Sequence, residues 1–306
     1  MLLLPFLHFR LRLVIVFSLI LYTFSSCSLV ETKSAIIPAF IYVPSLGFTT
    51  VNNGILTQGD SSNRFVDAWI YCNGNLVGNI GLPSLIPVQQ SGPCQIAFDP
   101  GILKTGQDGM RIPYPFAERQ IFYRTLTPNK IDTFYPRFKY LSSTVFSMIE
   151  GFESNGFQLT YNPNNAPGDT IIRVKDTSYN TAIVLGKFSG KVVMAPQSLR
   201  FELNSNQFTK EKLQPYAGSS VYLELDYKCD VPINVGMYSL NPSGIVQTID
   251  EFSSNISPFW NRVYICLDQD ITPTAAHTIF KISISVTNTT GVAPNVYFDN
   301  IKLVNF

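Results

Sequence analysis

The sequence predicts an all-β protein, with an N-terminal immunoglobulin-like β-sandwich followed by a C-terminal jelly-roll β-sandwich. Aromatic residues make up 13% of the chain, and Phe and Tyr, which dominate among them, favour strands over helices. Segments that alternate apolar and polar residues recur at short intervals, and Gly, Pro and Asn turn signals separate them. No convincing amphipathic helix interrupts the series. Many short strands of this kind are typical of sandwich folds.

The amino end predicts a secretion signal over residues 1–26. Arg10 and Arg12 precede the apolar run Leu13–Phe24, which is too short to cross a bilayer as a helix. Two serines and Cys27 follow, which makes the segment similar to bacterial lipoprotein signals, where this cysteine becomes the lipidated first residue. The alternative is an ordinary signal peptide with an incidental cysteine, because Phe24 stands where the lipoprotein motif prefers Leu, Val or Ile.

The remaining chain is long enough for two domains after a short polar tether over residues 27–34. Removing 26 of the 306 residues leaves 280, with 20 Lys and Arg against 21 Asp and Glu. A net charge of about −1 without a basic tract argues against a nucleic-acid partner. No later apolar stretch approaches the roughly 20 residues of a membrane helix. Membrane attachment is therefore expected only through lipid at Cys27.

Residues 35–140 are predicted to form the immunoglobulin-like sandwich. The strand Arg64–Cys72 alternates apolar and polar residues, Asn73-Gly74 supplies the left-handed backbone of a tight turn, and Leu76–Ile80 runs back as a hairpin. Further turn signals divide the rest of the segment into short strands. They are Leu82-Pro83, Gly92-Pro93 and Asp99-Pro100-Gly101.

Residues 143–306 are predicted to form the jelly roll. Its clearest strand is Val221–Cys229, in which the odd-numbered residues are apolar and the even-numbered ones are Tyr222, Glu224, Asp226 and Lys228. The even-numbered face is predicted to be solvated. Strands at 280–286 and 296–304 close the domain, and 208–213 is long enough for a single helical turn.

The cysteines other than Cys27 leave two interpretations open. Export permits disulfides, and Cys72 with Cys94 and Cys229 with Cys266 would give one bridge in each domain. Four buried free thiols explain the sequence nearly as well, because free cysteine is among the most buried residue types.

Candidate catalytic groups are few. The mature chain has one histidine, His277, which excludes a histidine-rich zinc site, and no Gly-x-Ser-x-Gly nucleophile motif is present. A glycoside hydrolase needs only two carboxylates, and Glu224 with Asp226 would be the pair on one strand face. The solvated-face interpretation of this pair is favoured, so the chain is expected not to be an enzyme.

Two resemblances extend these predictions. The run Ser62–Tyr71, the segment Asn73–Gly78, Leu82-Pro83 and Pro100-Gly101-Ile102 together resemble uncharacterised lipoproteins of the Bacteroidota. This resemblance implies a small immunoglobulin-like domain with a hairpin extension. Residues 143–306 are similar in outline to jelly-roll carbohydrate-binding modules, through Glu150-Gly151-Phe152-Glu153, Trp260–Tyr264 and Phe298–Leu303.

The second resemblance implies a structural calcium, with Glu150 or Glu153 and Asp299 as ligands, because calcium prefers carboxylate and carbonyl oxygens. Turn capping by these acids is the competing explanation.

The expected function is non-catalytic binding of an extracellular ligand, most plainly a glycan. Sugar recognition needs an exposed aromatic ring beside amides and carboxylates, and Tyr179, Tyr222 and Tyr238 are the candidates. The expected location is the outer membrane, lipid-anchored, at the cell surface. The alternatives are an assembly lipoprotein that binds another envelope protein, and a glycoside hydrolase or lyase.

Overall fold

The computed structural model describes residues 37–306 except 53–56, 107–108, 176–186, 217, 242, 244–245 and 272–277. Cys27, Tyr179 and His277 therefore lie outside the described residues. Residues 39–306 form one compact unit. The described chain is almost entirely strands, with only short helical turns at Lys104–Gly106 (η2), Lys210–Leu213 (α2) and Asp268–Ile271 (α3), which confirms the all-β prediction. In this part of the chain, no helix has the length and apolar character needed to span a bilayer.

Residues 39–140 form a first lobe of three sheets. The largest has the order β4-β3-β6-β7, with β8 also paired to β6, and the smaller ones are β5-β1-β9 and β10-β2. The strands are β1 (Ala39–Val43), β2 (Gly47–Thr49), β3 (Asp67–Cys72), β4 (Asn75–Gly81), β5 (Ser84–Val88), β6 (Gly92–Leu103), β7 (Arg111–Pro113), β8 (Gln120–Leu126), β9 (Ile131–Thr133) and β10 (Arg137–Lys139). The immunoglobulin-like identity of this lobe stays a prediction.

The predicted hairpin of the first lobe is confirmed. Strands β3 and β4 pair antiparallel, and Asn73 and Gly74 between them have φ values of 50° and 81°. The turn predicted at Asp99-Pro100-Gly101 is wrong, because β6 continues through it and pairs there with β3. Gly101 serves close packing instead, since a Cβ at this position would lie 1.5 Å from Asp67 Oδ1.

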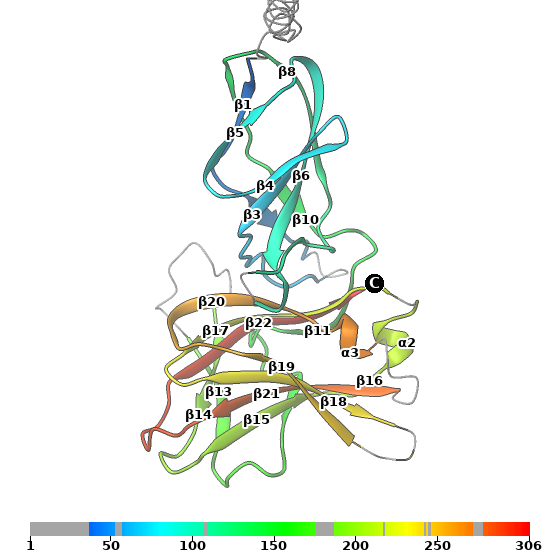
Figure 1. The fold of residues 1–306 in the computed structure, drawn as a ribbon. Coiled ribbons are helices and arrows are strands. Elements are labelled where there is room, and N and C mark those ends of the chain that lie inside the picture. The colour runs from blue at the N-terminus through cyan, green and yellow to red at the C-terminus, as the bar shows by residue number, and fades with distance from the viewer. Residues whose placement is uncertain are drawn as a thin grey trace, which may run out of the picture. The chain divides into compact units, whose positions relative to one another are not determined.

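The second lobe is a sandwich of two sheets. We call β13-β14-β22-β17-β20, with β11 paired to β22, the inner sheet, and β12-β15-β21-β18-β19, with β16 paired to β21, the outer sheet (Figure 1). The strands are β11 (Val145–Glu150), β12 (Leu159–Tyr161), β13 (Thr170–Val174), β14 (Ser189–Val193), β15 (Arg200–Ser205), β16 (Phe208–Thr209), β17 (Val221–Cys229), β18 (Ile233–Leu240), β19 (Val246–Ser253), β20 (Ser257–Cys266), β21 (Ile279–Thr287) and β22 (Val296–Asn305).

The apolar faces of both sheets pack together as predicted. Leu223 and Leu225 of β17 and Ile282 and Ile284 of β21 are fully buried in the same core. The single helical turn expected at 208–213 is also present, as α2, where the Thr209 hydroxyl accepts a hydrogen bond from the Lys212 backbone N–H.

The opposite face of β17 is not solvated, and the prediction that Glu224 and Asp226 lie in water is wrong. Both residues have no exposed surface. Tyr222 on the same face, together with Tyr264 of β20, packs in the hydrophobic core of the first lobe. The alternation identified which residues share a face of β17, but the first lobe covers that face.

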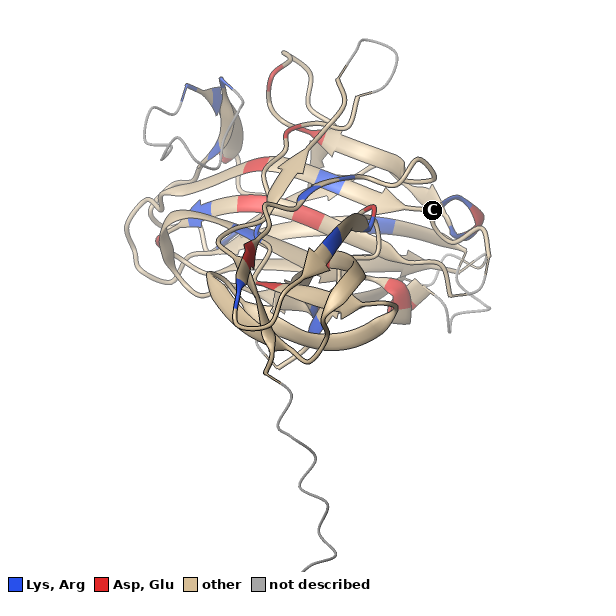
Figure 2. Cartoon of the chain, turned by 90° about the horizontal axis from the view of Figure 1, so that it is seen from above, with Lys and Arg blue, Asp and Glu red and all other residues tan. Residues whose placement is uncertain are grey.

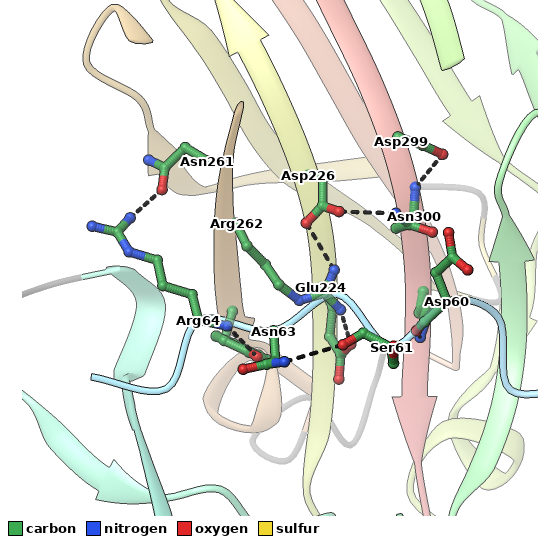
Figure 3. A network of polar contacts seen from close by, with 12 residues as sticks. Asp60, Ser61, Asn63, Arg64, Glu224, Asp226, Asn261, Arg262, Asp299 and Asn300 are labelled. Carbon is green, nitrogen blue, oxygen red and sulfur yellow. Dashed lines mark hydrogen bonds and ion pairs between the residues drawn. The ribbon is translucent and has the colours of Figure 1, made fainter. Parts of the chain in front are cut away.

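Charged groups of both signs pair with one another on this covered face of the inner sheet, which we call the buried layer (Figure 3). Arg262 donates Nη1 to Asp226 Oδ1 at 2.8 Å and Nη2 to Glu224. Tyr114 and Tyr140 of the first lobe donate their hydroxyls to the two oxygens of Glu224. Asp226 lies opposite Arg262 and Glu224 opposite Lys302 on neighbouring strands of the inner sheet, and Figure 2 shows basic and acidic segments close together in the chain. Desolvation is costly for an unpaired charge, so this pairing is what makes the buried layer tolerable.

Lys302 completes the layer. Its side chain has no exposed surface, and Nζ donates to the Asp60 carbonyl at 2.5 Å and to the Tyr140 hydroxyl at 3.4 Å. Burial lowers the pKa of Lys302 from 10.5 to about 8, although the Glu224 carboxylate opposes this shift.

The four described cysteines are buried free thiols. Cys72 lies beside Cys94 and shares a hydrogen bond with it. Burial, followed by this hydrogen bond, raises the pKa of the Cys72 thiol to about 11. Cys229 and Cys266 lie at opposite ends of the β17–β20 pair, opposite Ser257 and Tyr222 respectively. At about 3.3 Å per residue this separation is on the order of 20 Å, which excludes a bridge.

Candidate functional site

The candidate site is the face of the outer sheet that points away from the sandwich core. Strands β15, β21 and β18 run side by side there (Figure 1). Phe201 and Leu203 of β15 point into the core, so Glu202 and Asn204 between and beyond them lie on the opposite face. Residues opposite each other on the three strands form two rows across this face, Glu202–Ser285–Asn234 and Asn204–Ser283–Gly236.

Glu202 is the centre of the polar contacts. It accepts hydrogen bonds from Asn162 Nδ2 at 2.6 Å, from the Tyr238 hydroxyl at 2.8 Å and from Arg200 Nη2 at 2.8 Å. Burial alone would raise the pKa of this carboxyl, but hydrogen bonds from Arg200, Asn162 and Tyr238 outweigh burial and lower it. Glu202 is therefore an ionised and fixed acceptor at neutral pH.

Tyr238 gives the site an aromatic ring. The side chain is half-buried on β18, opposite Lys281 of β21 and Thr248 of β19. Burial, followed by the hydrogen bond to Glu202, raises the pKa of the phenol, so the hydroxyl keeps its proton and stays bonded to Glu202. The ring is thus held in one orientation with part of its surface accessible.

The row beside Tyr238 contains short side chains. Asn204 and Ser283 are buried, and Asn204 Oδ1 accepts no hydrogen bond from any residue that the structure describes. Gly236 continues the row, and a Cβ there would lie 2.5 Å from the Ile249 carbonyl oxygen. Glycine at this position permits the bulge that joins β18 to β19.

These groups are suited to binding hydroxylated ligands and poorly suited to acid catalysis. An ionised carboxylate, a carboxamide, hydroxyls and a partly accessible ring are the groups that take sugar hydroxyls and the apolar face of a pyranose. A general acid instead needs a raised pKa and a free proton. Glu202 has a lowered pKa and three donors already bound to it.

Of the two predicted ligand-binding tyrosines that the structure describes, Tyr238 is half-buried on the outward face of the outer sheet, beside the buried Glu202. The prediction that Tyr222 is exposed is wrong, since its side chain is 1% exposed and packs against Phe116 under the first lobe. Tyr179 lies outside the described residues.

The predicted acidic sites are used in other ways. Glu224 and Asp226 are inaccessible and paired with Arg262, so they do not form a catalytic carboxylate pair in a cleft. Glu150 accepts the backbone N–H of Phe152 at 2.7 Å with one oxygen and that of Gln158 at 2.5 Å with the other.

The other two predicted calcium ligands are also engaged. Glu153 accepts the N–H groups of Lys187 and Phe188, and Asp299 accepts that of Asn300. Within the described ranges, no three His, Cys, Asp or Glu residues gather in a way that could hold a metal. The residues present fit the capping explanation, and the calcium stays an untested prediction.

Glu202, Arg200 and Asn204 are not among the residues predicted from the sequence. A signal for them exists, because Arg200, Glu202 and Asn204 alternate with Phe201 and Leu203 as clearly as the residues of β17 do. Ser283 and Ser285 alternate with apolar residues in the same way, so alternation would have placed each set of polar groups on one face of its own strand.

No family model and no curated protein matches the chain. Among solved structures, a domain of bacteriophage CBA120 tailspike protein 4 has a TM-score of 0.38 at 11% identity, covering 51% of this chain and 20% of that one. The CBM22-1 xylan-binding domain of Paenibacillus barcinonensis Xyn10C has 0.37 at 9%, covering 54% and 97%. TmCBM61, solved with β-1,4-galactotriose, has 0.31 at 13%, covering 50% and 92%. The chain thus spans about a fifth of the tailspike, and likenesses at this level carry no functional conclusion.

Proposed function

We propose that this protein binds a glycan, without catalysis, at the half-buried Tyr238 on the outward face of the outer sheet. The supporting observation is the arrangement of Tyr238 and Glu202, in which a half-buried ring is fixed beside an ionised carboxylate. Asn204 and Ser283 add short polar groups in the adjoining row. A ring that is already immobilised loses little conformational entropy when a sugar stacks on it.

The proposed setting is the bacterial outer membrane, with the mature chain anchored through lipid at Cys27 and exposed at the cell surface. The support is the signal over residues 1–26 with a cysteine directly after it. Metabolic labelling with a clickable fatty acid tests this proposal. Incorporation into the wild type and its loss in Cys27→Ser would support the anchor, and an unlabelled wild type that is processed after residue 26 would contradict it.

The binding proposal is tested with residues 28–306 on a broad glycan array, followed by titration of each hit. Tyr238→Ala should weaken binding at least tenfold, because it removes the stacking ring, whereas Tyr238→Phe keeps the ring and should lose less. Tyr123→Ala is the matched control, since Tyr123 is 71% exposed on the first lobe.

Two results would overturn the proposal. One is no binding across the array by protein shown to be folded, and the other is a hit unaffected by Tyr238→Ala. Silence on the array combined with co-purification of one envelope protein in fixed ratio would favour the assembly role instead.

A further inference from the structure

A cavity of about 380 Å³ lies where the two sheets of the second lobe end. Strands β19 and β20 are the last strands of the outer and inner sheets, and both contribute to its wall. Thr105 and Gly106 of η2 and Arg64 of the first lobe line the same cavity. The volume falls within the range of small-molecule sites and suits about one sugar-sized ligand.

The wall of this cavity is held by close packing. Gly106 has φ +70°, and a Cβ there would lie 3.0 Å from both Phe252 of β19 and Val263 of β20. Thr105 beside it also has a positive φ of 54°. The turn is therefore seated directly on both strands, and the cavity is a built feature of the fold.

One wall contains a buried N–H donor with no hydrogen-bond partner among the described residues. Arg262 lines the cavity, and its side chain is 1% exposed. Its two terminal nitrogens donate to Glu224 and Asp226, but its Nε–H donates a hydrogen bond to none of the described residues (Figure 3). A buried N–H that stays unpaired is costly, so this group favours an acceptor supplied from the cavity.

The cavity lining also contains donors and acceptors that bond to one another. Arg64 is exposed, and its Nη1 donates to Asn261 Oδ1, while Asn261 Nδ2 donates to the Tyr227 hydroxyl at 2.8 Å. Glu251 has one buried oxygen without a partner in the described chain. Burial, followed by a hydrogen bond with Asp270 and the charges of Asp270 and Asp250, raises the pKa of Glu251 to about 8, so this carboxyl binds its proton more tightly than an ordinary glutamate does.

We propose that this cavity binds a small hydroxylated carboxylate of the hexuronate class, with the carboxylate between Arg64 and Arg262. Arg64 supplies the charge and guanidinium donors that match a carboxylate, and Arg262, whose terminal nitrogens bind Glu224 and Asp226, supplies its Nε–H. Ser253 in the lining offers a hydroxyl to the ring hydroxyls, the Ser257 hydroxyl, which donates to the Phe259 carbonyl at 2.7 Å, can accept from them, and Ile256 offers apolar surface. The site is separate from the outer-sheet face, and the inference does not rest on glycan binding there.

Calorimetric titration of residues 28–306 with glucuronate and with glucose tests the charge requirement. Glucuronate should bind at least tenfold more tightly than glucose, and lactate, which carries a carboxylate and one hydroxyl, should bind more weakly than glucuronate. A terminal glucuronate in a short oligosaccharide, tested in parallel, separates a free sugar acid from a glycan end as the source of the ligand.

Arg64→Ala should lower glucuronate affinity at least tenfold, with Arg64→Lys intermediate because it keeps the charge but loses the planar fork. Ser253→Trp should also abolish binding, since Ser253 is exposed at the cavity and a large side chain fills it. Arg124→Ala, an exposed arginine of the first lobe, is the matched control and should leave affinity unchanged.

The proposal would be overturned by folded protein that fails to bind glucuronate at millimolar concentration, which would mean that the cavity holds water only. Equal binding of glucose and glucuronate, or an Arg64→Ala variant with wild-type affinity, would also overturn it.

Discussion

Replacing Arg262 with Met should cost the protein about 3 kcal/mol of its free energy of unfolding. The substitution leaves Glu224 and Asp226 buried without the guanidinium that binds both, and side chains of all three are 1% exposed. Breaking a buried ion pair from one side costs roughly 3–5 kcal/mol. The lower end applies here, because Tyr114, Tyr140 and Asn300 still donate to the two carboxylates.

Urea unfolding followed by tryptophan fluorescence and by circular dichroism measures this loss. Arg119→Ala is the control, because its ion pair with Asp99 is at the surface and should contribute at most about 1 kcal/mol. The triple variant Arg262→Met, Glu224→Gln, Asp226→Asn should recover much of the stability, since it leaves no buried charge among these three residues. A loss from Arg262→Met as small as that from Arg119→Ala would refute the reasoning.

Three further predictions concern groups that the fold buries. Burial lowers the pKa of Lys302 to about 8, so between pH 8 and 10.5 the unfolded chain binds more protons than the folded one. The free energy of unfolding should therefore rise by on the order of 2 kcal/mol over pH 8–10. Lys302→Met should abolish this rise in urea unfolding measured at several pH values, and an unchanged slope would contradict the assignment. Oxidation of the folded protein should bridge Cys72 only to Cys94, and a peptide map showing any bridge to Cys266 would contradict the observed topology. Calcium chelation should leave the melting temperature unchanged because both Glu150 oxygens accept backbone N–H groups, and a rise of several degrees on adding calcium would show that the predicted site exists.

The hydrophobic periodicity predicted much of the fold. Period-two alternation identified β17, β21 and the β3–β4 hairpin, because a half-buried strand requires one apolar face. The turn expected at Asp99–Gly101 failed, since Pro-Gly is tolerated in β6 where Gly101 allows Asp67 to approach closely.

The functional surfaces were less predictable, because periodicity does not reveal what covers a polar face. Glu224 and Glu202 both alternate with apolar neighbours and both are buried, yet Glu224 lies under the first lobe and Glu202 lies on the opposite side of the sandwich, bonded to Asn162, Arg200 and Tyr238. Residues far apart in the sequence determine what covers each of these carboxylates. The hydroxyls of Tyr114 and Tyr140 meet Glu224 across 110 and 84 positions, which no local pattern reports.

The shared layer between the lobes has a consequence for how this protein can evolve. Tyr140 and Lys302 contact each other across 162 positions, and both adjoin Glu224. A gene fusion that exchanged one lobe for an unrelated module would remove the hydrogen-bond partners of Tyr140, Glu224 and Lys302 at the same time. The two lobes are therefore expected to be inherited together. Substitutions at Tyr114, Tyr140, Glu224 and Lys302 should be correlated among descendants of this protein.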